Sequence, residues 1–130
     1  MKGLKSDGTP IRVMAVDDSP MIRKLIRKYL QPEGFTVVGE AKNGKEAIEL
    51  YPNLKPDIIT MDVTMPIMDG LQAARIIKEI NVEQKILMLS AMGDDSIIAE
   101  AATYGVDHFC MKPFKSQQII QEVLNTFNNL

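Results

Sequence analysis

The stretch from residue 58 to residue 70 constrains the fold most, because a short apolar run stops abruptly at one carboxylate. Residues 58–61 are apolar or β-branched, Asp62 follows them directly, and Pro66 and Gly70 mark the loop beyond. Such a run suits a strand buried on both faces, and functional groups in parallel sheets collect just beyond the carboxyl ends of such strands. We therefore interpret Asp62 as the reactive residue, although an acid here could also begin a turn or cap the next helix.

Length and composition predict one folded domain. The chain has 130 residues, of which 45% are hydrophobic and 25% charged, so it can bury a core without disulfides or a structural metal. There is no signal-peptide pattern and no apolar run near the roughly 18 residues of a membrane span, so we expect a cytoplasmic, monomeric protein without membrane contact. The net charge of −2 comes without a basic cluster, and nucleic acid is therefore not an expected partner.

Two residues that each occur once disfavour several kinds of site. Cys110 is the only cysteine and lies in an apolar run, so a buried side chain is favoured over a redox or metal role. His108 is the only histidine, which makes a histidine-based zinc site or a Ser-His-Asp triad hard to build.

Five strand-then-helix units are expected after a leader. Residues 1–10 lack apolar periodicity, so we expect a flexible leader there and one domain over residues 11–130. The expected strands are residues 11–16, 35–39, 58–61, 85–89 and 108–111.

Capping residues and breakers mark the helices between the strands. Ser19 can cap the helix that Pro20 opens. Asn43 can cap a second helix, which should end at Tyr51 because Pro52 breaks it. The polar face of the first helix is expected to be solvated and carries Arg23, Lys24, Arg27 and Lys28. A third helix should begin at Gly70. A fourth should be capped by Asp94 or Asp95 and end at Gly105. A fifth, amphipathic helix around Ile119, Val123 and Phe127 should close the chain.

Alternating strands and helices with short connections predict a doubly wound α/β fold. Right-handed crossovers place helices on both sides of a parallel sheet, and we expect five strands in the order 2-1-3-4-5 with five helices. In that fold, the residues that directly follow strands one, three, four and five share one edge of the sheet. They are Asp17, Asp18, Asp62, Ser90 and Lys112.

The groups at this edge match phosphoryl chemistry on a metal. Carboxylates close together repel one another unless a cation lies among them, and an all-oxygen site suits Mg²⁺. Lys112 and the hydroxyl of Ser90 add a positive charge and a hydrogen-bond donor, which with the metal match the oxygens of a phosphoryl group. We therefore expect phosphoryl transfer to Asp62, because a carboxylate can form an acyl phosphate.

Four separated motifs together resemble the receiver domain of two-component response regulators. They cover about residues 11–128 and agree with that family in type, order and position at strand ends. Within the family the chain most resembles stand-alone chemotaxis receivers of the CheY type, given Ser90-Ala91-Met92-Gly93 and no appended output domain. The motifs are Asp17-Asp18, Met61-Asp62 with Met65-Pro66 and Met68-Asp69-Gly70, Ser90-Ala91, and Lys112-Pro113-Phe114.

The resemblance implies a flavodoxin-like fold and a role for each motif residue. Asp62 would accept a phosphoryl group from a histidine kinase. Asp18, Asp62 and the backbone carbonyl of Thr64 would bind Mg²⁺, and Asp17 would act on the metal mainly through water. Lys112 would hold a phosphate oxygen, and its bond to the following proline would be cis.

The resemblance also implies a switch and a responsive surface. The Ser90 hydroxyl would move to bond the phosphate, and Phe109 would swing inward, although many members carry a tyrosine at that position. Thr64 and Met92 would flank the path of the water that hydrolyses the acyl phosphate. Tyr104 could contact a partner on the face formed by the fourth helix, fifth strand and fifth helix, or could be an ordinary helix-end aromatic.

These roles predict a signalling phosphoacceptor with autocatalytic phosphorylation and self-dephosphorylation, and not an enzyme. The expected partners are a histidine kinase, a flagellar motor switch protein or another protein that binds the phosphorylated form, and a phosphatase. A phosphorelay shuttle is an alternative that the sequence does not separate. A phosphatase of the haloacid dehalogenase type is disfavoured because it needs a second aspartate where this chain has Thr64. A dinucleotide-dependent enzyme is also disfavoured, because no Gly-x-Gly-x-x-Gly motif follows a predicted strand.

Overall fold

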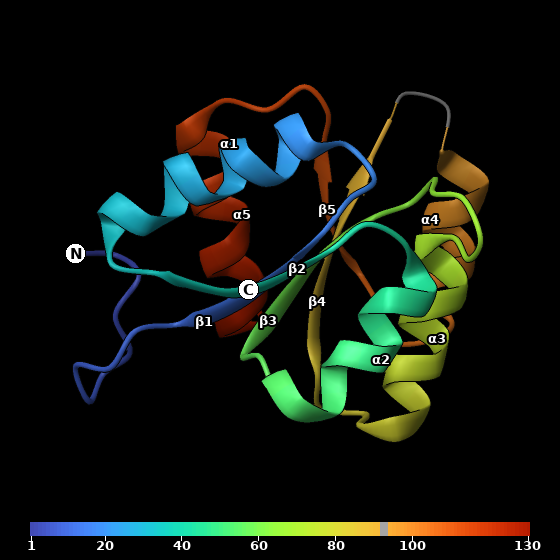
Figure 1. Cartoon of the computed structure of the whole chain (residues 1–130), viewed down its shortest axis with the longest axis horizontal. Helices are drawn as coiled ribbons and strands as arrows, with labels where there is room; N and C mark the ends of the chain where they lie inside the picture. The colour runs from blue at the N-terminus through green and yellow to red at the C-terminus, as the bar shows by residue number, and fades with distance from the viewer. Residues whose placement is uncertain (92–93) are drawn as a thin grey trace.

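The short apolar runs form five parallel strands, which pair in the order β2-β1-β3-β4-β5. The computed structural model describes residues 1–91 and 94–130. The predicted doubly wound fold and its strand order are confirmed (Figure 1). The strands are β1 (Arg12–Val16), β2 (Thr36–Ala41), β3 (Ile58–Asp62), β4 (Lys85–Ser90) and β5 (His108–Met111).

Helices cover both faces of this sheet. They are α1 (Pro20–Leu30), α2 (Gly44–Leu54), α3 (Gly70–Ile80), α4 (Asp95–Ala102) and α5 (Ser116–Asn128), and a 3₁₀-helix, η1 (Gln31–Glu33), follows α1. The helices α1 and α5 lie on one face, and α2, α3 and α4 lie on the other (Figure 1). Over the described residues, none of the helices combines the length and apolar character needed to cross a bilayer.

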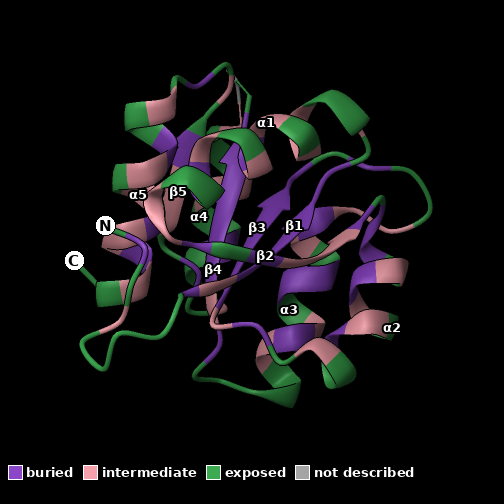
Figure 2. Cartoon of the chain, turned by 60° about the vertical axis from the view of Figure 1, so that its left-hand side comes forward, coloured by how far each residue is buried: buried purple, intermediate pink, exposed green. Residues whose placement is uncertain are grey.

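Each face of the sheet has its own apolar core, because alternate residues of a strand point to opposite faces. Met14 and Val16 of β1 belong to the core beneath α2, α3 and α4. Val13 and Ala15 belong to the core beneath α1 and α5. Figure 2 shows the buried strands between helices whose outer surfaces are exposed. Burial on both faces explains why the strands are nearly continuous apolar runs instead of alternating ones.

Three strands extend further than the sequence predicts. The strand β3 includes Asp62 and β4 includes Ser90, so both polar residues are the last of their strands. Asp62 pairs with Leu89, and Ser90 pairs with Met111. The ladder therefore fixes the backbone of both functional candidates. The strand β2 continues two residues beyond its predicted end, to Ala41.

The prediction that the second helix ends at Tyr51 is wrong. The helix α2 continues through Pro52 to Leu54, and Lys55 ends it with a left-handed conformation at φ 44°. The N–H of Lys55 donates to the carbonyl of Tyr51 at 3.0 Å. A proline this close to the helix end removes one hydrogen bond, and the turn that follows it restores the next.

Two of the predicted helix caps are confirmed and a third differs. Ser19 and Asn43 accept hydrogen bonds from N–H groups in the first turns of α1 and α2. Asp94 occupies the capping position of α4, but its carboxylate accepts a hydrogen bond from the N–H of Ala91 at 2.8 Å. An aspartate at this position can accept a hydrogen bond from an N–H before the helix or from one in the first turn of the helix. Here the carboxylate of Asp94 accepts from Ala91, which precedes the helix.

Residues 1–10, which the sequence predicts to be a flexible leader, contact the domain at several points, and their flexibility stays a prediction. The N–H of Gly3 donates to the carbonyl of Glu33 at 2.8 Å. The ammonium of Lys5 lies 3.0 Å from a carboxylate oxygen of Asp57. Backbone hydrogen bonds and a single ion pair do not require apolar residues at regular spacing. The hydrophobic pattern of the sequence therefore does not predict these contacts.

Candidate functional site

The carboxyl ends of β1, β3 and β5 bring together three charged side chains. Asp17 directly follows β1, Asp62 ends β3, and Lys112 directly follows β5. The Lys112 ammonium donates a hydrogen bond to Asp62 Oδ1 at 3.0 Å and lies 2.8 Å from Asp17 Oδ2. The lysine therefore sits between two carboxylates at the predicted edge of the sheet.

A third carboxylate completes an all-oxygen cluster. One carboxylate oxygen each from Asp17, Asp18 and Asp62 lies within 4.8 Å of the others. Asp17 is fully buried and Asp62 is 6% exposed, whereas Asp18 is exposed. Within the described residues, the buried Oδ2 of Asp17 has its ion pair with Lys112 but no contact with hydrogen-bond geometry. A buried carboxylate oxygen that accepts no hydrogen bond and lies beside two further carboxylates is a suitable ligand environment for a hard divalent cation such as Mg²⁺.

The ionisation of the site depends on burial and on this charge balance. Burial raises the pKa of Asp62 to about 6, the hydrogen bond from Lys112 opposes that rise, and the charge of Asp17 adds to it. Burial also disfavours the charged form of Lys112, but the close negative charges of Asp17 and Asp62 favour that form more strongly and raise the pKa of Lys112. The lysine is thus charged at neutral pH and does not by itself neutralise the acids.

Ser90 and Phe109 lie on the neighbouring strands β4 and β5. Ser90 is buried, and its carbonyl accepts a hydrogen bond from the N–H of Lys112 at 2.8 Å. Phe109 is half-buried, pairs with Met88 of β4, and packs against the core beneath α2, α3 and α4. Both residues therefore lie on, or directly at the end of, the strands that the sequence predicts. The carbonyl of Ser90 joins the backbone of β4 directly to that of Lys112.

The remaining predicted residues are less closely tied to the cluster. Thr64 is exposed in the loop after β3. Met92 falls outside the described residues, so its predicted part in hydrolysis stays a prediction. The hydroxyl of Tyr104 donates to the carboxylate of Glu100 at 3.0 Å. The peptide bond between Lys112 and Pro113 is cis, as predicted.

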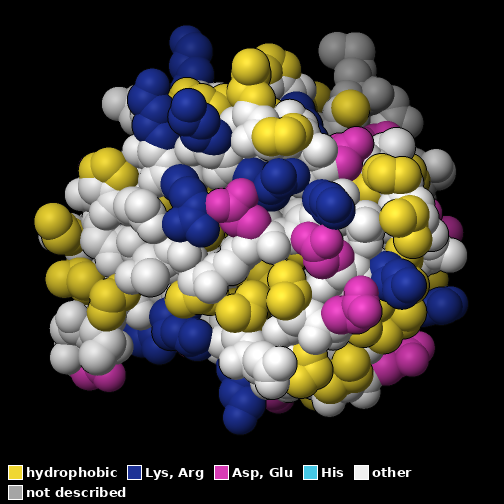
Figure 3. Space-filling model, in the orientation of Figure 1, with side chains coloured by type: hydrophobic (Ala, Val, Ile, Leu, Met, Phe, Trp, Pro, Cys, Tyr) yellow, Lys and Arg dark blue, Asp and Glu magenta, His cyan; other side chains and the backbone are white. Residues whose placement is uncertain are grey.

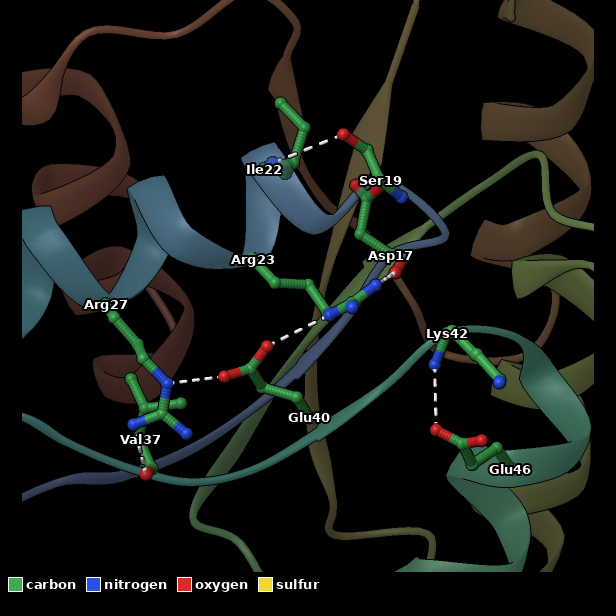
Figure 4. Close-up of polar contacts among 9 residues, drawn as sticks. All are labelled: Asp17, Ser19, Ile22, Arg23, Arg27, Val37, Glu40, Lys42 and Glu46. Carbon is green, nitrogen blue, oxygen red and sulfur yellow. Dashed lines mark hydrogen bonds and ion pairs between the residues drawn. The ribbon is translucent and has the colours of Figure 1, made fainter.

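Two residues near the site have roles that the sequence pattern does not show. Gly70 begins α3 so close to the site that a Cβ there would lie 1.8 Å from the carbonyl oxygen of Asp62. Arg23 was expected on a solvated helix face, but its guanidinium donates to the carbonyl of Asp17 at 2.7 Å (Figure 4). A helical pattern identifies the face of Arg23 but not the backbone group that the face covers.

The chain is similar over most of its length to chemotaxis proteins of two bacteria. It is 41% identical to the chemotaxis protein CheY of Bacillus subtilis, over 90% of this chain and 98% of that protein. It is 43% identical to the chemotaxis protein CheY of Thermotoga maritima, over 88% of this chain and 94% of that protein.

Comparison with solved structures agrees with this similarity. A chain of the CheX–CheY–BeF3–Mg²⁺ complex from Borrelia burgdorferi superposes with a TM-score of 0.92 at 32% identity, covering 97% of this chain and 96% of that one. The family model described as the response regulator receiver domain matches residues 13–124. Since that match spans most of the sequence, the chain belongs to the response regulator receiver domain family.

Proposed function

We propose that this receiver domain is a CheY-type response regulator that accepts a phosphoryl group on Asp62 from a histidine kinase. The observation that carries the proposal is the position of the Lys112 ammonium, 3.0 Å from Asp62 and 2.8 Å from the buried Asp17. The similarity to chemotaxis proteins over about nine-tenths of the chain supports a role in chemotaxis.

The acid cluster would hold the Mg²⁺ that this transfer needs. Asp18, Asp62 and the backbone carbonyl of Thr64 are the proposed protein ligands, and Asp17 acts on the ion mainly through water. The bound ion supplies positive charge that neutralises both the acids and the incoming phosphoryl oxygens.

The transfer itself needs one bond to form and one to break. An oxygen of the Asp62 carboxylate bonds to phosphorus while the bond between phosphorus and the kinase histidine breaks, which leaves an acyl phosphate. The carboxylate must be ionised for this attack, and a pKa of about 6 leaves most of it ionised at neutral pH. The chain is therefore a phosphoacceptor that takes part in its own phosphorylation and dephosphorylation.

Lys112 and Ser90 would hold the transferred group. The ammonium of Lys112 already bonds Asp62, so it can pass to a phosphoryl oxygen with little movement. The Ser90 hydroxyl would move toward the same group, and Phe109 on the neighbouring strand would enter the space that is freed. The two residues form one element with two arrangements, and a phosphate that binds one arrangement better shifts the equilibrium toward it.

Kinase-driven phosphorylation followed by a binding measurement tests this function. We expect the affinity for a flagellar motor switch protein to increase when a histidine kinase and ATP are present, and the Asp62→Asn variant should show no increase. Onward transfer of phosphate to a histidine phosphotransfer domain, without any phosphorylation-dependent binding to the switch protein, would contradict the proposal and indicate a phosphorelay shuttle.

A further inference from the structure

Two arginines of α1 hold one carboxylate of β2. Arg23 Nε donates to Glu40 Oε1 at 2.9 Å, and Arg27 Nε donates to Glu40 Oε2 (Figure 4). The hydrogen bond from Arg27 is the largest cause that lowers the pKa of Glu40, burial opposes it, and Arg23 adds to the lowering. Figure 3 shows Lys and Arg side chains gathered over α1 with acidic side chains among them. Glu40 is thus ionised and offsets part of this positive charge.

Arg23 differs from Arg27 because it also reaches the candidate site. Its Nη1 donates to the backbone carbonyl of Asp17 at 2.7 Å. The N–H of Asp17 donates to the carbonyl of Ala41 at 3.0 Å, and Asp17 Oδ1 accepts from the N–H of Ser19 at 3.0 Å. Both backbone groups of Asp17 are therefore held by neighbouring elements, and Arg23 supplies the bond on the carbonyl side.

The carbonyl that Arg23 holds belongs to the peptide group between Asp17 and Asp18. A peptide group is planar, so fixing its oxygen also fixes the direction in which the chain enters Asp18. Asp18 is exposed, and packing does not hold its side chain. The guanidinium is itself fixed by its second bond to Glu40, and its donors have a rigid, forked geometry.

We propose that Arg23 is a positioning residue that fixes the peptide between Asp17 and Asp18 and thereby raises the affinity of the acid cluster for Mg²⁺. The inference rests on the metal site of the proposed function. Arg23 has two opposing effects on that site, because its positive charge repels a cation while its hydrogen bonds preorganise the ligands. Glu40 lies 2.9 Å from the guanidinium and counters its charge, so the positioning effect is the larger.

The dissociation constant for Mg²⁺ distinguishes these effects by sign. It is obtained from the dependence of the melting temperature on Mg²⁺ concentration for the parent chain, Arg23→Gln and Arg27→Gln. Both variants leave Glu40 with one arginine, but only Arg23→Gln frees the carbonyl of Asp17. We expect Arg23→Gln to weaken Mg²⁺ binding roughly tenfold, as loss of an outer contact to a ligand does, and Arg27→Gln to change it by less than about twofold.

The conservative variant Arg23→Lys gives a second, independent measurement. It keeps the charge and the apolar stem, but one ammonium cannot reproduce the fork between Asp17 and Glu40, so an intermediate loss of Mg²⁺ affinity is expected. If Arg23→Gln does not unfold cooperatively, Arg23→Lys alone decides, and it must weaken Mg²⁺ binding.

Three outcomes would overturn the inference. Unchanged Mg²⁺ affinity in the Arg23 variants would show that the carbonyl bond does not matter, and tighter binding in Arg23→Gln would show that charge repulsion dominates. Equal weakening in Arg23→Gln and Arg27→Gln would show a general loosening of α1. If the parent chain itself does not bind Mg²⁺, the metal site of the proposed function fails, which is a separate result.

Discussion

Asp62 lies where folding and function make opposite demands on one side chain. Its carboxylate is 6% exposed, lies in a cluster with two other acids, and has the single ammonium of Lys112 as its charged hydrogen-bond partner among the described residues. Burial is the main reason that its pKa rises from 3.8 to about 6. The folded state therefore binds this proton more tightly than the unfolded state, and ionisation of Asp62 lowers the free energy of unfolding.

The first prediction concerns this pH dependence without divalent metal. Between about pH 4 and pH 6, Asp62 is protonated to a greater extent in the folded chain than in the unfolded chain, so its contribution to stability falls as the pH rises through this window. Asp62→Asn lacks the charge, so its stability advantage over the parent should grow across the window to at most about 3 kcal/mol. Urea unfolding of both proteins at a series of pH values measures the difference. An advantage that is constant with pH would contradict the account.

The sequence predicts the residues of the cluster because each one follows an apolar strand. The positions of Asp17, Asp62 and Lys112 need only the strand ends and a parallel sheet, and the structure brings them together. The contact between Arg23 and a backbone carbonyl was not predictable in this way. It depends on the rotation of α1 about its axis and on its height above β1, which packing against the sheet determines.

At the scale of elements, the connection from β3 to α3 shows how tightly the helices approach the site. Asp69 caps α3 by accepting a hydrogen bond from the N–H of Gln72 at 2.8 Å. The N–H of Gly70 donates to the carbonyl of Val63 at 2.8 Å. The first turn of α3 thus lies directly against the backbone that carries Asp62, and only a residue without a Cβ fits there.

The second prediction is that Gly70→Ala disturbs both the fold and the site. The added Cβ would lie 1.8 Å from the carbonyl oxygen of Asp62, so α3 or the end of β3 must move. We expect a loss of about 1 to 3 kcal/mol in stability, as for other overpacked sites, together with weaker Mg²⁺ binding. Chemical denaturation and Mg²⁺ titration measure the two effects. Arg75→Ala, an exposed change one turn further along α3, is the control, and equal effects from both variants would contradict this explanation.

The third prediction tests the coupling between β4 and β5. Ser90→Ala should leave phosphorylation of Asp62 largely intact but weaken phosphate-dependent binding of a partner, because it removes the hydroxyl that we propose responds to the phosphate. Parallel measurements of labelling and of partner affinity separate the two steps. Undiminished phosphate dependence in Ser90→Ala would mean that the signal reaches the partner by another route.

Sequence patterns located the elements better than their ends. The helix α2 continues through Pro52 because a proline near the last turn removes only one backbone hydrogen bond. The rule that proline ends a helix overestimates this effect near a helix end. The contacts of residues 1–10 involve the distant residues Glu33 and Asp57, so they are invisible to a local pattern.

At the scale of the whole molecule, the site exists only when the fold is complete. Asp17 and Asp18 come from the end of β1, Asp62 from β3 and Lys112 from beyond β5, so the unfolded chain has no such cluster. A ligand that binds this cluster therefore binds only the folded state and stabilises it. The fold itself was predictable because each strand and helix has its own apolar pattern, and handedness restricts how they connect.

The fourth prediction is that Mg²⁺ raises the melting temperature. At a concentration 100 times the dissociation constant the gain in stability should be about 2.7 kcal/mol. Asp18→Ala should abolish the gain, whereas Glu79→Ala, which removes an exposed carboxylate near the far end of α3, should keep it. Thermal unfolding with and without millimolar Mg²⁺ measures it. An unchanged melting temperature of the parent chain would contradict the metal site.

The central claim is that Asp62 is the phosphoacceptor, and labelling by a small-molecule phosphodonor tests it most directly. With Mg²⁺ present, mass spectrometry should find one acid-labile phosphoryl group on the parent chain and none on Asp62→Asn, which keeps the shape but lacks the nucleophilic charge. Asp69→Asn is the matched control, since asparagine also caps a helix, and it should be labelled like the parent. Full, acid-stable labelling of Asp62→Asn would contradict the claim and would indicate a hydroxyl, such as that of Thr64 or Ser90, as the acceptor.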